Sequence, residues 1–569
     1  MTLHGIGASA GVGLGTVVCV REQNLDYSGA VYSGAEQEKA RLDAAVKTFC
    51  EKTQRMADTV LASVGEKESE ILAGQIMMLN DPFMLSQMKE AIDGGAVAEA
   101  AVDSVCTLYA DMFAGVDDEL MRQRATDVRD IRARMLALLL GQETMDPAAM
   151  PEGTVLAAHD LTPSMTVGLD RNRIAAIITE TGGRTSHSAI LARALEVPAV
   201  LSVPGLMAHV ENGMLAAVDG GQGTVLLQPD EGQQEEYRAR REAHRQEREM
   251  LKAYREKPTL DADGRHYGLY ANIGNPQDAL AARQAGAEGI GLFRTEFLFM
   301  DRPAAPSEEE QYAAYCEAAA AMEGREVIIR TLDVGGDKAV GYLHMAKEEN
   351  PFLGHRAIRY CLDEEPLFKT QLRALLRAGA EHHNVKIMLP LVTSVDEVRA
   401  ARALLEECKE ELRREGLPFD DRIHLGVMIE TPAAALTADL LAREADFFSI
   451  GTNDLTQYTM AVDRGNAEVE KLYTTFHPGV LRSIREVIRA AKEAGIPVGM
   501  CGEAAADPAL TPVLLAFGLD EFSVSASAVP AVRRSISLWG ARQAEETART
   551  AMGFATAGEV QAYLNRAAR

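Results

Sequence analysis

The chain has 569 residues, more than a single hydrophobic core usually holds, so we expect several domains. Hydrophobic residues make up 47% of the sequence and charged residues 25%, which is typical of a soluble globular protein. The formal net charge of −26 argues against nucleic acid or an anionic membrane surface as a partner and would suit a small basic protein.

The seven cysteines are scattered along the chain and form no C-x-x-C pair. This spacing argues against a disulfide framework and against a zinc site, and it fits a reducing cytoplasm. The N-terminus lacks the basic start and apolar core of a signal peptide, and no apolar run is long enough to span a membrane. We therefore expect a cytoplasmic protein without direct membrane insertion.

The N-terminal part of the chain predicts an α/β domain that a helical segment interrupts. Residues 1–20 are rich in glycine and predict a turn region followed by a strand at residues 16–20. Apolar residues then recur with helical spacing from about residue 36 to residue 141, and helix breakers are few. Strand-like segments return at residues 154–158, 174–178, 199–201 and 224–227.

A short motif in this domain carries a candidate nucleophile. The sequence GGRTSHS at residues 182–188 places His187 after a glycine pair and at the start of a helix-like run. Neutral imidazole is a good nucleophile near pH 7, and a helix N-terminus attracts phosphate. Arg184 adds a cation that is compatible with phosphate. The motif therefore predicts a histidine that becomes phosphorylated, whereas a lone histidine beside a glycine turn would more often be a buried structural residue.

Residues 231–256 are strongly charged, favour a helix and offer few apolar side chains to bury. We interpret this stretch as a linker helix between domains. A short coiled coil is the alternative, but apolar heptads are missing.

The C-terminal part alternates apolar segments with helix-like stretches. Eight strand-then-helix units are typical of a (β/α)8 barrel, in which catalytic groups lie at the carboxyl ends of the strands. The predicted strands cover residues 268–272, 289–293, 327–331, 387–390, 425–430, 447–451, 498–502 and 521–525.

Chemically useful side chains gather at the predicted ends of these strands. Arginine binds phosphate and carboxylate in a bidentate manner, paired carboxylates supply the oxygen ligands that Mg²⁺ prefers, and a lone thiol could donate a proton to carbon. Taken singly, each charged residue would more often form a surface ion pair, and the cysteine would be a small buried hydrophobe. Their shared position instead predicts a site for a small anionic substrate, formed by Arg294, Arg330, Arg356, Glu430, Asn453, Asp454, Arg464 and Cys501. Four histidines have no such context, and we assign no role to His344, His382, His383 and His424.

Over essentially its whole length, the chain resembles enzyme I of the bacterial phosphotransferase system, the phosphoenolpyruvate-protein phosphotransferase family. The resemblance rests on several long motifs in the right order. They are GGRTSHSAILAR around His187, GLFRTEFLFM around Arg294, RTLDVGGDK from Arg330, NPFLGHR up to Arg356, SIGTND up to Asp454, and GMCGE around Cys501.

The resemblance implies a division of labour between the domains. His187 would take the phosphoryl group of phosphoenolpyruvate and pass it to a histidine of the small phosphocarrier protein HPr, with release of pyruvate, as the first step of the sugar phosphotransferase system. The barrel would bind phosphoenolpyruvate and Mg²⁺, with Glu430 and Asp454 as metal ligands and Cys501 as the acid that protonates the enolate. The remaining implied roles are substrate binding by Arg294, Arg330, Asn453 and Arg464, with Arg356 and Lys338 as neighbours, and support of His187 by Thr166 and Arg184.

The resemblance also implies the domain boundaries and a homodimer that forms through the barrel. We expect an α/β phosphohistidine domain at residues 1–20 and 143–230, a helical HPr-docking subdomain at 21–142, a linker helix at 231–257 and a phosphoenolpyruvate-binding (β/α)8 barrel at 258–569. Because the histidine and the phosphoryl donor belong to different domains, a domain movement would bring them together, with the linker helix as the hinge.

Two positions depart from the family pattern, since His355 stands where relatives more often have Trp and Ala10 stands where Pro is usual. Neither residue is catalytic.

Three alternative functions fit less well. A pyruvate phosphate dikinase or phosphoenolpyruvate synthase would need an ATP-binding domain before the histidine domain, and a nitrogen-branch relative would carry an extra N-terminal sensory domain. A catalytically idle docking protein would lack His187, Cys501 or the arginines.

Overall fold

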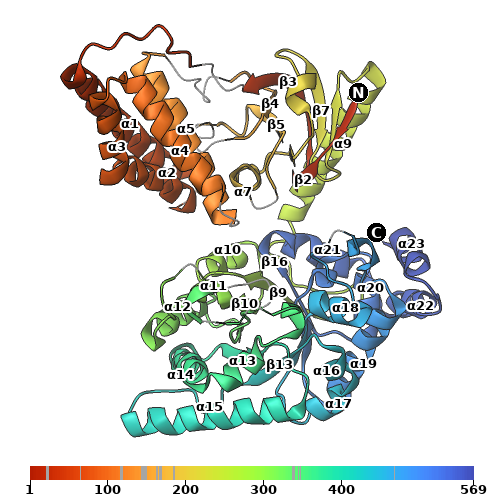
Figure 1. Ribbon diagram of the computed structural model, residues 1–569. Coiled ribbons are helices and arrows are strands. Elements are labelled where there is room, and N and C mark those ends of the chain that lie inside the picture. Colours follow the sequence, from red (N-terminus) through yellow and green to blue (C-terminus); the bar gives the residue numbers. More distant parts are fainter. Residues whose placement is uncertain are drawn as a thin grey trace. The chain divides into compact units, whose positions relative to one another are not determined.

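A computed structural model describes the chain except for residues 21–24, 64–65, 116–118, 143–149, 162–164, 166–168, 184–185, 301, 336–339, 344, 347, 467 and 569. The chain divides into two compact units, Met1–Glu247 and Arg248–Arg569 (Figure 1). No helix in these described ranges has the length and apolar composition that crossing a membrane requires.

The first unit contains an eight-stranded mixed sheet in the order β1-β8-β7-β3-β4-β5-β6-β2. The central strands β3 to β6 run parallel, whereas β1, β7 and β8 pair antiparallel on one side and β2 pairs antiparallel with β6 on the other. The strands are β1 (Thr2–His4), β2 (Ile6–Ser9), β3 (Val12–Val20), β4 (Thr154–Ala158), β5 (Ile174–Thr179), β6 (Ala199–Leu201), β7 (Leu215–Asp219) and β8 (Thr224–Leu227), and the helices between them include α7 (His187–Ala194) and α8 (Leu206–His209).

The four strands predicted after residue 150 are confirmed, but the prediction of a turn region before residue 16 is wrong. Residues 2–4 and 6–9 are strands, and β3 begins at Val12. A β-carbon at Gly15 would lie 1.9 Å from the carbonyl oxygen of Gly153, and one at Gly13 would lie 2.2 Å from that of Ala175. These glycines therefore allow a neighbouring backbone to approach a strand closely. The sequence also gave no prediction of β7.

The predicted helical segment is confirmed as a bundle on one side of the first unit (Figure 1). Its core contains Leu42, Phe49, Met88 and Ile131, all fully buried. Asp81 caps the helix that begins at Pro82, because its carboxylate accepts hydrogen bonds from two backbone N–H groups of the first turn. The helices are α1 (Ala35–Ser63), α2 (Glu66–Leu79), α3 (Pro82–Asp93), α4 (Ala98–Ala114) and α5 (Glu119–Leu139).

The predicted linker helix forms as α9 (Glu231–Lys252). The expectation that it buries little is wrong for its first turns, because Tyr237 is buried against Ala217 and Leu226 of the sheet. Arg240 forms an ion pair with Asp219 at the end of β7. The N-terminal part of α9 is therefore a packed element of the first unit, and the boundary between the two units falls inside the helix.

The second unit is a closed barrel of eight parallel strands, as predicted, with helices around it (Figure 1). The predicted strand ends agree with the structure to within two residues. The strands are β9 (Gly268–Ile273), β10 (Ile290–Arg294), β11 (Val327–Arg330), β12 (Val385–Leu389), β13 (Leu425–Ile429), β14 (Phe448–Ile450), β15 (Val498–Met500) and β16 (Glu521–Ser525). The helices are α10 (Asp278–Gln284), α11 (Glu296–Phe299), α12 (Glu308–Ala321), α13 (Ile358–Asp363), α14 (Glu365–His382), α15 (Val395–Glu415), α16 (Pro432–Leu436), α17 (Ala438–Leu441), α18 (Thr452–Met460), α19 (Pro478–Ala494), α20 (Thr511–Phe517), α21 (Val529–Ser537), α22 (Ala541–Ala551) and α23 (Ala557–Ala567).

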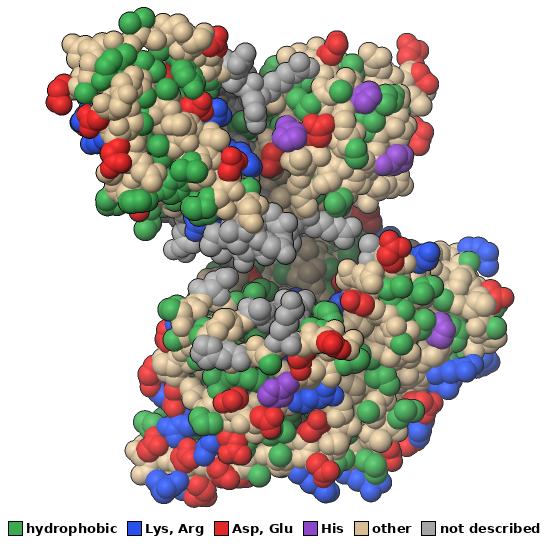
Figure 2. All heavy atoms as spheres, viewed as in Figure 1, with side chains coloured by type: hydrophobic (Ala, Val, Ile, Leu, Met, Phe, Trp, Pro, Cys, Tyr) green, Lys and Arg blue, Asp and Glu red, His purple; other side chains and the backbone are tan. Residues whose placement is uncertain are grey.

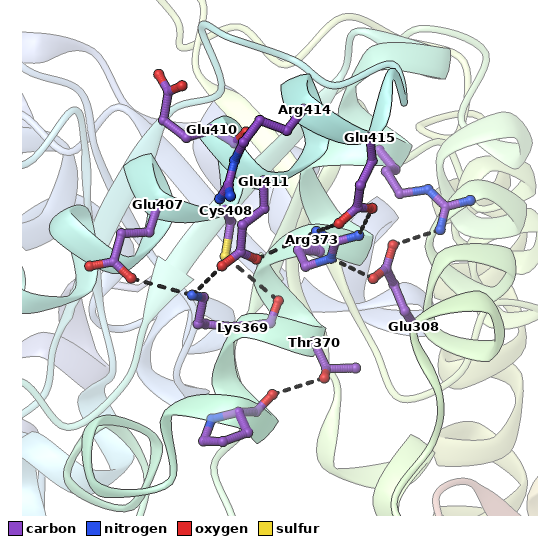
Figure 3. A network of polar contacts seen from close by, with 12 residues as sticks. Glu308, Lys369, Thr370, Arg373, Glu407, Cys408, Glu410, Glu411, Arg414 and Glu415 are labelled. Atoms are coloured by element: carbon purple, nitrogen blue, oxygen red, sulfur yellow. Dashed lines mark hydrogen bonds and ion pairs between the residues drawn. The ribbon is translucent and has the colours of Figure 1, made fainter.

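The outer helices α12, α14 and α15 are joined by ion pairs. Acidic and basic side chains are interspersed on this part of the barrel surface (Figure 2). Arg373 of α14 donates to Glu308 of α12 at 2.7 Å and to Glu415 of α15 at 2.6 Å, and Lys369 pairs with Glu411 (Figure 3). The positive charges of α14 are thus neutralised by carboxylates from both neighbouring helices.

Candidate active site

A cavity of about 350 Å³ opens at the carboxyl ends of the barrel strands. This is the end at which barrel enzymes place their chemistry. Eight residues selected from the sequence line it together: Arg294, Arg330, Arg356, Glu430, Asn453, Asp454, Arg464 and Cys501. Their roles in a reaction remain predictions.

An ion-paired chain of side chains forms one wall of this cavity. Arg330 Nη2 donates to Glu296 at 2.8 Å and lies 3.0 Å from Oδ2 of Asp333. Arg356 Nη2 donates to the other oxygen of Asp333 at 2.7 Å. All four side chains are buried. One carboxylate thus fixes two guanidiniums relative to each other.

Both guanidiniums have nitrogens without a partner in the described part of the protein. Nε of Arg330, and Nε and Nη1 of Arg356, are buried and have no hydrogen-bond partner among the residues that the structure describes. Burial alone would lower the pKa of each guanidinium, but the surrounding carboxylates outweigh this effect and raise it, so both stay cationic. Buried cationic donors without a protein partner are suited to bind an anion with phosphate or carboxylate oxygens.

Glu430 and Asp454 bring two carboxylates to the same cavity. Glu430 follows β13, and its Oε1 accepts a hydrogen bond from the backbone N–H of Leu391 at 2.6 Å. A β-carbon at Gly451 would lie only 2.8 Å from Oε2 of Glu430, so glycine leaves the space that this carboxyl occupies. Burial and the nearby charges of Asp454 and Asp333 raise the pKa of Glu430 to about 8. Two adjacent carboxyl groups of this kind fit a divalent cation with oxygen ligands.

Two residues with β-carbons have positive φ beside residues that line the cavity. Ala357, directly after Arg356, has φ 54° and ψ −129°, and Leu391, whose N–H binds Glu430, has φ 54°. Such conformations cost on the order of 1–3 kcal/mol and persist where the surrounding structure enforces them. Here the two conformations occur next to Arg356 and at the residue whose N–H binds Glu430, so they help to place a guanidinium and a carboxylate.

Asp454 and Asn453 lie in the first turn of α18. Arg464 Nη1 lies 3.0 Å from one carboxylate oxygen of Asp454, and Arg356 Nη2 lies 3.8 Å from the other. The side-chain oxygen of Asn453 accepts a hydrogen bond from the backbone N–H of Glu503 at 3.0 Å, which connects the ends of β14 and β15. These contacts hold the residues in defined positions on the cavity wall.

Cys501 follows β15 and is buried beside Leu292 and Met428 of the barrel interior. Burial raises the pKa of its thiol to about 11, and the charge of Glu430 acts in the same direction. The thiol is therefore protonated at neutral pH. It lines the cavity and so could donate a proton to a bound molecule.

His187 is the first residue of α7, as the sequence predicts, and it belongs to the other unit. Ser186 caps this helix, because its hydroxyl accepts a hydrogen bond from the backbone N–H of Ala189 at 3.4 Å. The following Ser188 donates to the carboxylate of Asp160 at 3.4 Å. The backbone of the motif thus provides the helix N-terminus that favours a phosphoryl group. The predictions for Lys338, Thr166 and Arg184 fall outside the described residues.

The roles of Glu296 and Asp333 were not predicted from the sequence. Both follow a selected arginine by two or three positions, in Arg294-Thr-Glu and Arg330-Thr-Leu-Asp. An acidic residue so close to a candidate anion-binding arginine was the available signal. The structure adds that each carboxylate orients a guanidinium at the cavity.

Three families of phosphoenolpyruvate-utilising enzyme domains match the chain. They are the N-terminal domain over residues 4–124, the mobile domain over residues 150–223 and the phosphoenolpyruvate-binding domain over residues 248–539. The last of these covers the barrel and its cavity.

Whole-length relatives agree with these matches. The phosphoenolpyruvate-protein phosphotransferase of Geobacillus stearothermophilus is 45% identical, and the match covers 99% of this chain and 98% of the relative. The proteins of the same name from Bacillus subtilis and Lactococcus lactis are 43% and 44% identical, over 99% of this chain and 99% and 98% of their own lengths. The chain therefore belongs to the phosphoenolpyruvate-protein phosphotransferases, a family of transferases.

Proposed function

We propose that this protein transfers the phosphoryl group of phosphoenolpyruvate to its own His187 and then to a histidine of the phosphocarrier HPr, releasing pyruvate, as the first step of the sugar phosphotransferase system. The observation that carries the proposal is the barrel cavity, which is lined together by Arg330 and Arg356, whose guanidiniums have nitrogens without a partner in the part of the chain that the structure describes, and by the carboxyl pair of Glu430 and Asp454. The names of the whole-length relatives support it.

The guanidiniums bind the phosphate and carboxylate of the substrate. Arg294, Arg330 and Arg464 supply charge-assisted hydrogen bonds, and Asn453 adds an amide donor. Arg356 belongs to the same group through its two unpartnered nitrogens, and Lys338 is a further neighbour by its place in the motif that begins at Arg330.

Glu430 and Asp454 are the residues that would hold Mg²⁺. Their oxygen-only donor set and the space that Gly451 leaves fit this ion. When bound, Mg²⁺ would offset the negative charge of the phosphate and of the developing enolate. Glu430 would act as a ligand in its deprotonated form.

His187 attacks phosphorus with the lone pair of an imidazole nitrogen while the bond between phosphorus and the bridging oxygen breaks. The electrons of that bond leave as the enolate of pyruvate, which the arginines stabilise. Cys501 donates its thiol proton to the methylene carbon, which gives pyruvate, and the thiolate then regains a proton from water. Thr166 and Arg184 orient and stabilise the phosphohistidine.

The helical subdomain receives HPr. Apolar side chains are visible on its surface in Figure 2, and Met77, Phe83, Leu108 and Met112 on α2, α3 and α4 are each more than half exposed. An exposed apolar group on an acidic chain suits a small basic partner.

The proposed organisation has four parts. The phosphohistidine domain takes residues 1–20 and 143–230, the HPr-docking subdomain 21–142, the linker helix 231–257 and the barrel 258–569. The barrel forms a homodimer, and the protein works in the cytoplasm. The three family matches support this division, since they separate residues 4–124, 150–223 and 248–539.

The experiment is the intact mass of the protein at neutral pH after incubation with phosphoenolpyruvate and Mg²⁺ without ATP. We expect one added phosphoryl group on the wild type and on His159→Ala, a control for an exposed histidine of the same unit, and none on His187→Ala. Addition of purified HPr should then move the phosphoryl group to HPr. A wild-type chain that gains no mass while folded, or a His187→Ala variant that does gain it, would contradict the proposal.

A further inference from the structure

A second group of metal-ligating side chains lies outside the barrel mouth, on the surface between α12 and α14. Cys316 of α12 and Glu381 and His382 of the last turn of α14 each place a ligand atom within 4.8 Å of the other two. The chain separates Cys316 from Glu381 by 65 residues. The scattered cysteine spacing, which argued against a zinc site, therefore does not test a site assembled by two neighbouring helices.

We propose that Cys316, Glu381 and His382 bind one divalent transition-metal ion of the zinc class. Zinc lies about 2.3 Å from a thiolate sulfur and about 2.1 Å from a carboxylate oxygen or an imidazole nitrogen. Tetrahedral geometry then requires about 3.6 Å between sulfur and oxygen and about 3.4 Å between nitrogen and oxygen. Cys316 Sγ lies 3.8 Å from Oε2 of Glu381, and His382 Nε2 lies 3.8 Å from Oε1, the other oxygen of the same carboxylate. With one ligand atom from each residue, the three atoms lie within 4.8 Å of one another. Reaching tetrahedral spacing around one ion therefore requires side-chain shifts on the order of 1 Å.

The donor set selects the class of metal. A thiolate, an imidazole and a carboxylate suit zinc, cobalt and related ions, whereas Mg²⁺ and Ca²⁺ prefer oxygen ligands alone. The three side chains leave one tetrahedral position for water, so the ion would be held by three protein ligands. The Glu381 side chain is 52% exposed and that of His382 is 21% exposed, which leaves the site open to solvent.

Neighbouring groups orient the carboxylate before an ion arrives. The hydroxyl of Tyr312, one turn before Cys316 on α12, donates to Oε2 of Glu381. The guanidinium of Arg377 lies 4.4 Å from the centre of the Tyr312 ring. Outer contacts of this kind fix the direction of a ligand and raise metal affinity.

Binding must displace the thiol proton. Burial and the charge of Glu381 raise the pKa of Cys316 to about 11, so the free site holds a thiol. The balanced step is the loss of one proton to water as the sulfur–metal bond forms. The charged and titratable groups that face the thiol are Tyr312 on its own helix and Arg377, Glu381 and His382 on α14. Apparent affinity should therefore rise with pH, because binding releases the thiol proton.

The test is a titration of the full-length protein with Co²⁺, followed by the absorption of thiolate-to-metal charge transfer, and then displacement by Zn²⁺. We expect a saturable charge-transfer signal from one ion per chain. Cys316→Ser should abolish it, and His382→Asn should weaken binding at least about tenfold. Cys50→Ser, which removes another half-exposed thiol, and Cys501→Ser, which removes the thiol near the Glu430–Asp454 pair, should leave the signal intact.

The same variants distinguish a built site from incidental thiol binding. Metal should raise the thermal unfolding temperature of the wild type more than that of Cys316→Ser, which keeps the Glu430–Asp454 pair, and the two proteins should unfold alike in a chelator, which shows that the variant is folded. The proposal is overturned if the wild type gives no thiolate signal, if the signal survives Cys316→Ser, or if Cys50→Ser or Cys501→Ser removes it. Self-phosphorylation by phosphoenolpyruvate is not the readout, so its failure would leave this test intact.

Discussion

Replacing Asp333 with asparagine tests the charge arrangement at the barrel mouth. Asparagine keeps the size of the side chain but removes its charge, and its amide nitrogen would face one guanidinium as donor against donor. Arg330 would retain Glu296 at 2.8 Å, whereas Arg356 would retain only Asp454 at 3.8 Å. We therefore expect Arg356 to lose its position more than Arg330 does.

The magnitude follows from burial. Removing one partner from a buried ion pair costs about 3–5 kcal/mol. The lower end, about 3 kcal/mol, applies to Asp333→Asn because Glu296 still pairs with Arg330 and the cavity admits water. A displacement of a substrate-binding group by about 1 Å costs on the order of 100-fold in rate. We expect self-phosphorylation by phosphoenolpyruvate to fall by about that factor, with a raised KM as the larger part.

Two assays measure these effects separately. The chain has one tryptophan, Trp539, which is buried in the barrel unit, so its fluorescence during urea unfolding reports the stability of that unit. Single-turnover phosphorylation measures the loss of activity. Asp363→Asn is the matched control, because Asp363 is exposed and pairs with His355 at 2.8 Å on the surface, where an ion pair contributes at most about 1 kcal/mol. Wild-type stability and wild-type kinetics in Asp333→Asn would refute the assignment of Asp333 as the residue that positions Arg330 and Arg356.

Three further predictions concern stability. Arg533→Met should destabilise the barrel by about 3–5 kcal/mol in the same fluorescence assay. The buried guanidinium donates to backbone carbonyls, including those of Tyr254 and Gly286, and these carbonyls would lose their donor. A loss of stability below about 1 kcal/mol would contradict this prediction. Arg373→Ala, in the ion-paired group of Figure 3, should cost no more than about 1–2 kcal/mol and less at high salt, because its partner carboxylates are partly exposed. Burial raises the pKa of Asp127 to about 6, above its unfolded value, so its contribution to the stability of the helical subdomain is present below pH 4 and lost as pH rises through about 6. Asp127→Asn should therefore slow hydrogen exchange in α5 at pH 7 but not at pH 4, and equal effects at both pH values would count against a titrating carboxyl.

The barrel could be predicted because each of its strands is a short apolar run followed by a polar strand end. The pattern is visible in the sequence because parallel strands are buried on both faces and therefore consist mainly of apolar residues. The first strands of the other unit could not be predicted in the same way. Gly13 and Gly15 break the apolar pattern of β3, and the reason for them is the approach of the Gly153 and Ala175 backbones, which only the fold reveals. Likewise, the charged composition of α9 conceals Tyr237, a single aromatic side chain that attaches the start of the helix to the sheet.

Candidate site residues were predictable where the residue type alone indicates the chemistry. An arginine, a cysteine or a pair of carboxylates at the strand ends suggests a function, and the eight residues selected in this way line one cavity. A carboxylate beside an arginine suggests only an ion pair. For this reason the sequence did not predict that Glu296 and Asp333 orient the guanidiniums of Arg330 and Arg356. The proximity of Cys316 and His382 could not be predicted from the sequence, because helix packing brings the two residues together and their spacing along the chain does not indicate it.

The charges of the cavity suggest why anion and cation binding depend on each other. Among the described residues that line it, there are four arginines and five carboxyl groups, namely Glu296, Asp333, Glu430, Asp454 and Glu503. With Glu430 protonated, which its raised pKa permits at pH 7, the two sets balance. A substrate with a phosphate and a carboxylate then enters a site that has no excess of positive charge, although it offers directed donors. A divalent cation on Glu430 and Asp454 would supply that excess. Because linkage is reciprocal, phosphoenolpyruvate should tighten Mg²⁺ binding by the same factor by which Mg²⁺ tightens phosphoenolpyruvate binding, and Glu430→Gln should abolish this coupling.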